Sequence, residues 1–247
     1  MPADPSSFRA IVSRRSVPLV ITTVPEEAAR GTERGQAMAK QQIIGVVSQK
    51  GGVGKSTLCQ LIAREAAAGG RQAKILDFDM KQMTSTDWVR LRLERDTEPA
   101  IHAEPVKNVR KALKLNRDYD IVLLDGAPGS PKRTAEIVSV CDLIVLPTGV
   151  SRADLMPTLA LARRIAELRS GVGGPVVALC RVLTDKETAT ARAAIAEAGF
   201  EIIDGEMIER PGYRHAQDLG RSASETPFPS LNERAQRLAH SILARLA

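Results

Sequence analysis

Aromatic residues are scarce in this chain of 247 residues. Phe, Trp and Tyr together make up only 3% of the sequence. Proteins that bind single-stranded nucleic acid usually stack the bases on aromatic side chains. The composition therefore argues against a protein that recognises single-stranded DNA or RNA by base stacking.

Cysteine is also rare, and Cys59, Cys141 and Cys180 lie far apart in apolar runs. Because the chain has no C-x-x-C pair, the sequence supports neither a disulfide framework nor a zinc site. The histidines share no metal-binding spacing with each other or with a cysteine. We expect the three cysteines to be small buried side chains in a reducing compartment.

Long apolar runs are missing as well. No run approaches the roughly 18 residues of a membrane span, and the N-terminus lacks the apolar core of a signal peptide. The sequence therefore predicts a cytoplasmic protein. Its formal net charge of +6 favours a polyanionic partner, with nucleic acid as the first candidate and an anionic membrane surface as the second.

Residues 1–40 differ from the rest of the chain, because Pro, Ser and Arg are scattered there without a sustained hydrophobic period. We interpret this segment as a disordered N-terminal extension or a mis-assigned start, with translation beginning at Met38. An alternative is a partner-binding arm built on Arg14, Arg15 and the apolar run 17–24.

Residues 41–247 have the pattern of one α/β domain. Segments with apolar residues at helical spacing alternate with six short apolar runs, at residues 43–48, 74–78, 120–125, 142–147, 176–181 and 200–204. Continuous hydrophobicity is typical of strands that are buried on both faces of a parallel sheet. The sequence therefore predicts a doubly wound, mostly parallel sheet with helices on both faces, whose ligand binds beyond the carboxyl ends of the strands.

The stretch SQKGGVGKST, residues 48–57, follows the first of these runs and opens a helical segment. Its three glycines allow a tight turn that directs backbone N–H groups inward, and the helix N-terminus adds its positive end. This is the context of a nucleotide phosphate loop. We expect Lys55 to neutralise the β- and γ-phosphates of ATP, Ser56 to bind Mg²⁺ and Thr57 to contact the α-phosphate.

One position departs from the usual phosphate-loop motif, which has a glycine six residues before Lys55. Gln49 occupies that place, and Lys50 follows it. The run KGGVGKST resembles the deviant Walker A motif of the ParA/MinD class of P-loop ATPases. The resemblance implies that Lys50 reaches across a nucleotide-sandwich dimer to the phosphates of the other subunit. The predicted ATP-binding residues are Lys50, Gly51, Gly52, Val53, Gly54, Lys55, Ser56 and Thr57.

Three acidic residues follow predicted strands where this family has its catalytic motifs. Asp77 and Asp79 match the family's second motif, and Asp125 matches the end of the Walker B strand. The resemblance implies that Asp79 orients the attacking water, that Asp77 supports the Mg²⁺ shell and that Asp125 binds Mg²⁺. Each could instead be a helix N-cap or turn residue. The predicted catalytic residues are Lys50, Lys55, Asp79 and Asp125, and the predicted metal-binding residues are Ser56, Asp77 and Asp125.

Other segments resemble the small, ParF-like partition ATPases. Pro147, Ser151 and Asp154 match a strand, a proline and an S-x-x-D helix start, and the chain has the VLLDGAPGS form of Walker B without a preceding helix-turn-helix domain. One departure is the loop after Asp79, which is a residue longer than the family's D-x-D-P-Q motif. We expect this loop to affect the hydrolysis rate more than nucleotide binding.

DNA binding without sequence preference requires several cationic side chains that face phosphates. The densest cationic group contains Arg90, Arg92, Arg95, Lys107, Arg110, Lys111, Lys114 and Arg117. The C-terminal candidates are Arg181, Arg210, Arg214 and Arg221. Residues 207–227 resemble the family's nucleotide-edge and DNA-contact region, where Pro211 removes a backbone donor. The resemblance does not indicate which arginines contact DNA. Any of these side chains could also belong to a solvated face.

The last predicted helix, residues 230–247, carries apolar residues on one face. MinD-like relatives use such a helix to bind membranes, but this one is rich in alanine and has no aromatic residue. We therefore expect it to dock onto the sheet, and a membrane is not an expected partner.

The resemblance implies a partition ATPase that forms a homodimer with ATP, binds DNA non-specifically in that state and associates with the nucleoid. A ParB-like or other centromere-binding adaptor would stimulate its slow hydrolysis of ATP. One alternative is a scaffold that positions a chemoreceptor array, a microcompartment or a conjugative DNA-processing complex. Others are a MinD-like membrane-associated ATPase and an iron–sulfur carrier, which the missing C-x-x-C pair disfavours.

Overall fold

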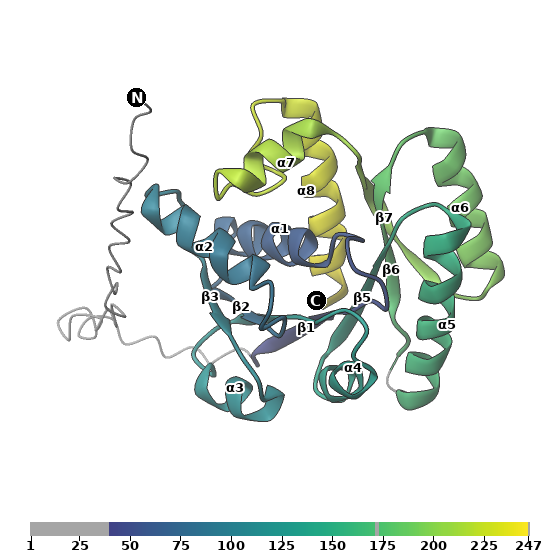
Figure 1. The fold of residues 1–247 in the computed structure, drawn as a ribbon, viewed down its shortest axis with the longest axis horizontal. Helices are drawn as coiled ribbons and strands as arrows, with labels where there is room; N and C mark the ends of the chain where they lie inside the picture. Colours follow the sequence, from purple (N-terminus) through teal and green to yellow (C-terminus); the bar gives the residue numbers. More distant parts are fainter. Residues whose placement is uncertain (1–39, 171–172, 247) are drawn as a thin grey trace, which may run out of the picture. The chain divides into compact units, whose positions relative to one another are not determined.

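Seven parallel strands form one sheet in the order β3-β2-β4-β1-β5-β6-β7 (Figure 1). The computed structural model describes residues 40–170 and 173–246, so Met38 and the rest of residues 1–39 lie outside the described residues. The strand order confirms the predicted α/β fold with a doubly wound, parallel sheet. The strands are β1 (Gln42–Val46), β2 (Ala73–Asp77), β3 (His102–Pro105), β4 (Ile121–Asp125), β5 (Leu143–Thr148), β6 (Val176–Val182) and β7 (Glu201–Ile208).

The strand β3 was not among the predicted strands. Its sequence is HAEP, and no residue of it is fully buried. It lies at the edge of the sheet and pairs only with β2. An edge strand has a neighbour on one side only, so it does not need the continuous apolar run by which the buried strands were recognised.

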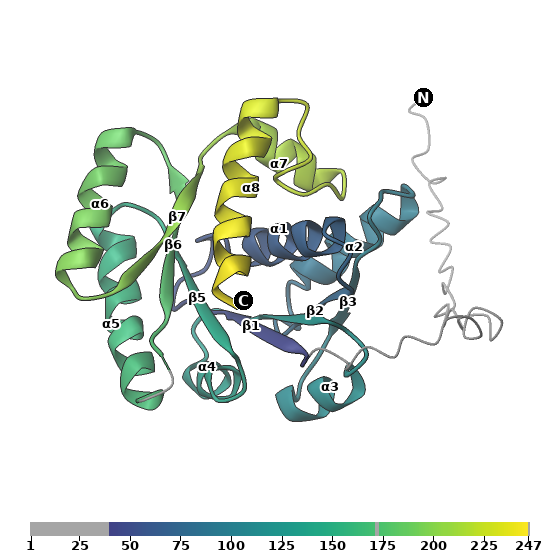
Figure 2. The ribbon, with the colours of Figure 1, turned by 180° about the vertical axis from the view of Figure 1, so that it is seen from behind.

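Helices cover both faces of this sheet (Figures 1 and 2). The apolar residues of α1, α2, α7 and α8 share one core with one face, and those of α3, α4, α5 and α6 pack against the other. In the described part of the chain, no helix has the length and apolarity needed to cross a membrane. The helices are α1 (Lys55–Ala68), α2 (Thr84–Glu94), α3 (Val109–Leu115), α4 (Pro131–Val138), α5 (Arg152–Leu168), α6 (Asp185–Glu197), α7 (Pro211–Asp218) and α8 (Pro229–Leu243), followed by the 3₁₀ turn η2 (Ala244–Leu246).

The C-terminal helix α8 docks onto the sheet, as its sequence predicted. Ala235, Leu238 and Ile242 are fully buried and belong to the core that α1 and β7 share. Gly205 of β7 has a φ of +83°, and a Cβ at this position would lie 2.9 Å from the backbone nitrogen of Leu238. The glycine therefore permits the close packing of α8 on β7, and the apolar face of α8 is used inside the domain.

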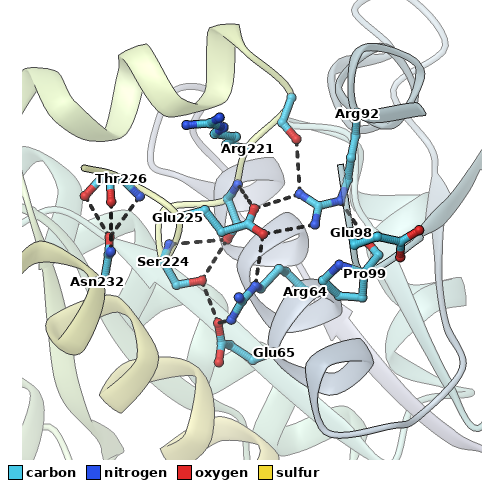
Figure 3. A network of polar contacts seen from close by, with 12 residues as sticks. Arg64, Glu65, Arg92, Glu98, Pro99, Arg221, Ser224, Glu225, Thr226 and Asn232 are labelled. Atoms are coloured by element: carbon cyan, nitrogen blue, oxygen red, sulfur yellow. Dashed lines mark hydrogen bonds and ion pairs between the residues drawn. The ribbon is translucent and has the colours of Figure 1, made fainter. Parts of the chain in front are cut away.

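A buried ion-pair network joins α1, α2 and the segment between α7 and α8 (Figure 3). Arg92 of α2 is fully buried and donates two hydrogen bonds to the carboxylate of Glu225, at 2.7 and 3.0 Å. Its other donors bond to the carbonyls of Pro99 and Gly220, and Arg64 of α1 approaches Glu225 to 3.2 Å. Arg92, counted from the sequence among the cations available to DNA, is therefore a core residue.

The environment of Glu225 keeps this carboxylate charged. Burial alone raises its pKa, but hydrogen bonds from Arg92 and the backbone of Ser222, with the charges of Arg92 and Arg64, outweigh burial and hold the pKa below its ordinary value. A buried guanidinium without a charged partner would lower the stability of the folded protein. The network therefore holds three elements together, and two of them, α1 and α2, also contribute to the site described next.

Candidate nucleotide-binding site

The predicted phosphate loop connects the carboxyl end of β1 to the N-terminus of α1. Gly54 precedes α1 with a φ of +97°, and a Cβ there would lie 3.3 Å from the Cβ of Cys180 in β6. A left-handed backbone beside a neighbouring strand favours glycine at this position. The loop therefore lies close over the carboxyl end of β6, at the edge of the sheet where ligands of such folds bind.

A cavity of about 430 Å³ opens beside this loop. Gly51, Gly52, Gly54, Lys55, Ser56 and Thr57 of the predicted ATP-binding set line it, together with Asp79 and Asp125. Lys50, Val53 and Asp77 are not among its lining residues. The structure thus brings most of the predicted residues together in one cavity whose size is typical of small-molecule sites.

Lys55 places a nearly buried ammonium group in this cavity, with 7% of the residue exposed. Its Nζ donates a hydrogen bond of 3.5 Å to the carbonyl of Lys50. Burial lowers the pKa of Lys55, although the charges of Asp125 and Asp79 oppose this shift. A cation that is desolvated in this way interacts strongly with a phosphate, because little water screens it.

Asp125 ends β4 beside Ser56 and is almost completely buried. Burial raises its pKa to about 6, against the stabilising hydrogen bonds from Ser56 and Ser85. A serine hydroxyl and a carboxylate side by side offer the oxygen ligands that Mg²⁺ prefers when it also binds substrate phosphates. These residues therefore fit a magnesium site.

Ser85, in the first turn of α2, is a site residue that the sequence did not indicate. Its Oγ donates a hydrogen bond of 2.7 Å to Oδ2 of Asp125. It thereby fixes the orientation of a carboxylate on β4, which is 40 positions away in the sequence. No spacing rule or short motif connects these two residues.

Asp77 caps α2 rather than facing the cavity. Its Oδ2 accepts hydrogen bonds from the backbone nitrogens of Ser85 and Thr86, at 3.1 and 3.2 Å, and its Oδ1 accepts one from Asp79 at 3.0 Å. Helix capping was the alternative role that the sequence left open for this residue. A role for Asp77 in the Mg²⁺ shell stays a prediction.

Asp79 closes the turn that the longer loop forms before α2. Its Oδ1 accepts hydrogen bonds from the backbone nitrogens of Lys81 and Gln82, and its carbonyl accepts one from Met83. Within the described residues, no hydrogen bond to its Oδ2 is found. The carboxylate lines the cavity while one of its oxygens organises the loop, which leaves the other for a water molecule.

Lys50 is held at the start of α5. Its Nζ donates hydrogen bonds to Oδ1 of Asp154 at 2.7 Å and to the carbonyl of Ala153 at 3.0 Å. Ser151 is the N-cap of α5 and donates a hydrogen bond to the other oxygen of Asp154. The hydrogen bonds from Lys50 and Ser151 lower the pKa of Asp154. The predicted S-x-x-D helix start is therefore correct, and its aspartate, Asp154, binds Lys50 of the phosphate loop.

The arginines expected to contact DNA lie mostly at the cavity. Arg181, Arg210 and Arg214 line it, whereas Arg221 is exposed in the segment after α7. Pro211 is the first residue of α7, where the backbone N–H has no partner in the helix, so the missing donor weakens nothing. Contact of these arginines with DNA stays a prediction.

One face of α7 closes the cavity, although only the arginines of this region were singled out from the sequence, as DNA contacts. Gln217 donates hydrogen bonds of 2.8 Å to the hydroxyl of Thr57 and to Oε1 of Gln60. The lining residues at its start and along it are spaced as one helical face, which is the signal that could have identified them: Arg210, Tyr213, Arg214 and Gln217.

Comparisons with known proteins agree with this geometry. A family model described as ParA, NUBPL iron-transfer P-loop NTPase, matches residues 39–130. The chain is 24% identical to the chromosome-partitioning ATPase Soj of Thermus thermophilus, over 84% of this chain and 98% of Soj. It is also 24% identical to the protein ParA of Rhizobium radiobacter, over 69% of this chain and 80% of that protein.

Solved structures show the same fold. The septum site-determining protein MinD of Pyrococcus horikoshii, complexed with Mg-ADP, superposes with a TM-score of 0.63 at 16% identity, covering 83% of this chain and 97% of that one. The phosphate loop between β1 and α1 and the aspartate at the end of β4 agree with these similarities. The chain therefore resembles the ParA/MinD class of P-loop ATPases in sequence and in fold.

Proposed function

We propose that this protein is a Mg²⁺-dependent partition ATPase that closes into a homodimer around two molecules of ATP. The observation that carries the proposal is the position of Lys50. Its ammonium group lies on α5, bonded to Asp154, and Lys50 does not line the cavity of its own chain. This position supports a role for Lys50 at the nucleotide of another subunit.

The remaining residues serve the nucleotide of their own chain. Lys55 and the backbone N–H groups of the glycine-rich loop bind the phosphates, and Gln217 holds Thr57 from α7. Ser56 and Asp125 would hold Mg²⁺, which neutralises negative charge on the β- and γ-phosphates when it is bound. Ser85 keeps the Asp125 carboxylate in place.

Hydrolysis requires an oriented water molecule more than a strong base, because phosphoryl transfer depends mainly on positioning and on charge stabilisation. Asp79 is the residue that would orient this water. Its Oδ1 is committed to the turn before α2, so Oδ2 would accept the water's hydrogen bond. The adaptor expected for such an ATPase, a ParB-like or centromere-binding protein, would accelerate this step and release the dimer.

DNA binding by the dimer is supported by a cationic stripe on α3. The buried face of this helix contains Val109 and Ala112, with Asn116 just beyond its end. Three exposed cations lie on α3 itself and one more lies just outside each end of the helix. The ion pairs found among the described residues involve none of these five. This set, here named the α3 stripe, is Lys107, Arg110, Lys111, Lys114 and Arg117.

The α3 stripe lies in the helix layer opposite α7 and α8, away from the face that closes the nucleotide cavity. Uncompensated Lys and Arg side chains bind DNA by displacing condensed counterions, without reading sequence. A protein that coats DNA in this way associates with the nucleoid. Arg181, Arg210 and Arg214, in contrast, line the nucleotide cavity.

The test measures mass by light scattering and DNA binding by fluorescence anisotropy, with Mg²⁺ and ATP or ADP. The wild type is expected to dimerise and bind DNA only with ATP. Lys50→Ala is expected to bind ATP but to stay monomeric and leave DNA unbound, whereas the control Lys186→Ala on α6 should behave as the wild type. A wild type that stays monomeric at saturating ATP would contradict the dimer, and a dimeric Lys50→Ala would contradict the role of Lys50.

A further inference from the structure

The carboxyl end of β6 is irregular beside the phosphate loop. The register between β6 and β7 shifts between Leu179 and Val182, and Arg181 lies within this shift with a φ of +57°. A left-handed backbone is unfavourable for arginine, and such conformations persist mainly where the surrounding structure and the function require them. A bulge next to a site commonly redirects a side chain toward it.

The side chain of Arg181 joins three parts of the site. Its Nη1 donates a hydrogen bond of 3.1 Å to the carbonyl of Gly52 in the phosphate loop. Its Nε donates one of 3.0 Å to Oε2 of Glu209, the residue that follows β7. The guanidinium also lines the nucleotide cavity. Arg181 therefore connects the ends of β6 and β7 to the tip of the glycine-rich loop.

We propose that Arg181 is a positioning residue for ATP binding, which holds the peptide between Gly52 and Val53 in the orientation that receives the phosphates. The carbonyl of Gly52 and the N–H of Val53 belong to one planar trans peptide and point in opposite directions. Holding the carbonyl therefore also sets the direction of the N–H. The two glycines at 51 and 52 allow many backbone conformations, so the loop gains order from this external contact.

Glu209 orients the guanidinium for this task. Its carboxylate engages Nε, which leaves the terminal nitrogens of Arg181 free to reach the loop. The Arg181 side chain is 59% exposed, so its ion pair with Glu209 contributes little stability by itself. The left-handed backbone is therefore better explained by the contact with the phosphate loop than by the ion pair.

This inference rests on nucleotide binding at the phosphate loop and requires neither a dimer nor DNA. The experiment uses the full chain and measures the Kd for Mg²⁺·ATP and DNA binding at saturating ATP. Arg181→Gly removes the guanidinium and suits the left-handed backbone, and Arg181→Asn tests the same loss with a side chain that tolerates this conformation. Arg234→Ala is the matched control, because Arg234 pairs with Glu206 at 3.1 Å outside the cavity.

The Kd for ATP is expected to rise about tenfold in Arg181→Gly and Arg181→Asn, since a hydrogen bond from a charged donor is lost. Glu209→Gln should raise it less, and Arg234→Ala should leave it unchanged. Amide hydrogen exchange in residues 49–54 of the nucleotide-free protein should become faster in the Arg181 variants only.

A wild-type Kd for ATP in both Arg181 variants would overturn the proposal. If these variants also lost DNA binding at saturating ATP, Arg181 would be a DNA contact instead. If the wild type itself binds no DNA, the proposed function fails while the effect on ATP affinity still tests Arg181.

Discussion

Single side chains in this site combine structural and chemical roles. Asp79 closes a turn with one carboxylate oxygen and faces the cavity. The carboxylate of Asp154 accepts a hydrogen bond from Ser151, the N-cap of α5, and also holds Lys50. The ion pair between Lys50 and Asp154 is partly exposed, so its contribution to stability is about 1 kcal/mol or less. In the dimer proposed above, Lys50 would therefore leave Asp154 at small cost to reach the second nucleotide.

The double role of Asp79 predicts the effect of two substitutions. Asp79→Asn keeps an oxygen that can accept the backbone hydrogen bonds of Lys81 and Gln82, so the loop should retain its turn. It loses the charge that orients the attacking water, and the turnover of ATP should fall by about 100-fold. The affinity for ATP should stay within about threefold of the wild type, because the substitution preserves the conformation of the loop.

Steady-state phosphate release and nucleotide titration measure the two quantities separately. Asp79→Ala serves as the comparison, because it removes both the charge and the turn. Normal turnover in Asp79→Asn would show that another group orients the water.

At the scale of elements, two helices supply what the phosphate loop lacks, namely one wall of the nucleotide cavity and an exposed group of cations. The helix α7 brings Gln217 to Thr57 and closes the cavity, although it lies 160 positions further along the chain. The helix α3 lies in the other layer and exposes a stripe of cations. Nucleotide binding and the proposed DNA binding are thus assigned to different helices.

The α3 stripe predicts a salt-dependent loss of DNA binding. Lys111→Glu and Lys114→Glu, singly and combined, should weaken ATP-dependent DNA binding and reduce the slope of log K against log salt by about 0.9 for each lost phosphate contact. Lys186→Glu, an equally exposed lysine on α6, is the control for the change in net charge. The measurement is a salt series of DNA affinities with duplexes of unrelated sequence.

ATP affinity should be unchanged in the α3 variants, because the stripe lies outside the nucleotide cavity. DNA binding that equals the wild type in the double variant, across the whole salt series, would exclude the α3 stripe as the contact surface.

At the scale of the whole domain, the network around Glu225 holds the elements that surround the nucleotide. Arg64 lies on the helix that starts at the phosphate loop, and Arg92 lies on the helix that follows Asp79. Gly220, whose carbonyl bonds to Arg92, is the second residue after α7 and has a φ of +70°. A Cβ at Gly220 would lie 2.5 Å from the backbone nitrogen of Arg92. Glycine is therefore needed where these segments meet.

Glu225→Gln should destabilise the domain by about 3–5 kcal/mol at pH 7, because it leaves the buried guanidinium of Arg92 without its counter-charge. The folded pKa of Glu225 lies below its ordinary value of 4.5. Its stabilising contribution is therefore fully present above pH 4.5 and is lost as the pH falls through the folded pKa. The difference between wild type and variant should shrink below that pH.

Urea unfolding at several pH values measures this difference, and Glu187→Gln, an exposed glutamate in α6, is the control. A difference that stays constant from pH 7 to pH 3 would show that the charge of Glu225 is not the stabilising feature.

Prediction from the sequence succeeded where the signal was local. The parallel sheet, the phosphate loop, the start of α5 at Ser151 and the docking of α8 all follow from short motifs or from hydrophobic periodicity. It missed the edge strand β3, whose residues need not be apolar, and it counted Arg92 as a surface cation. The ion pair that buries Arg92 involves Glu225, which is 133 positions away.

The sequence by itself determined the fold class, the phosphate loop and the family resemblance, because each is encoded by neighbouring residues whose spacing matches the period of a strand, a turn or a helix. Only the tertiary structure decided that Arg181 meets Gly52, that Gln217 meets Thr57 and that Lys50 rests on Asp154. These pairs are 129, 160 and 104 positions apart. The doubly wound sheet brings the carboxyl ends of distant strands to one edge, and no local pattern states which side chains will meet there.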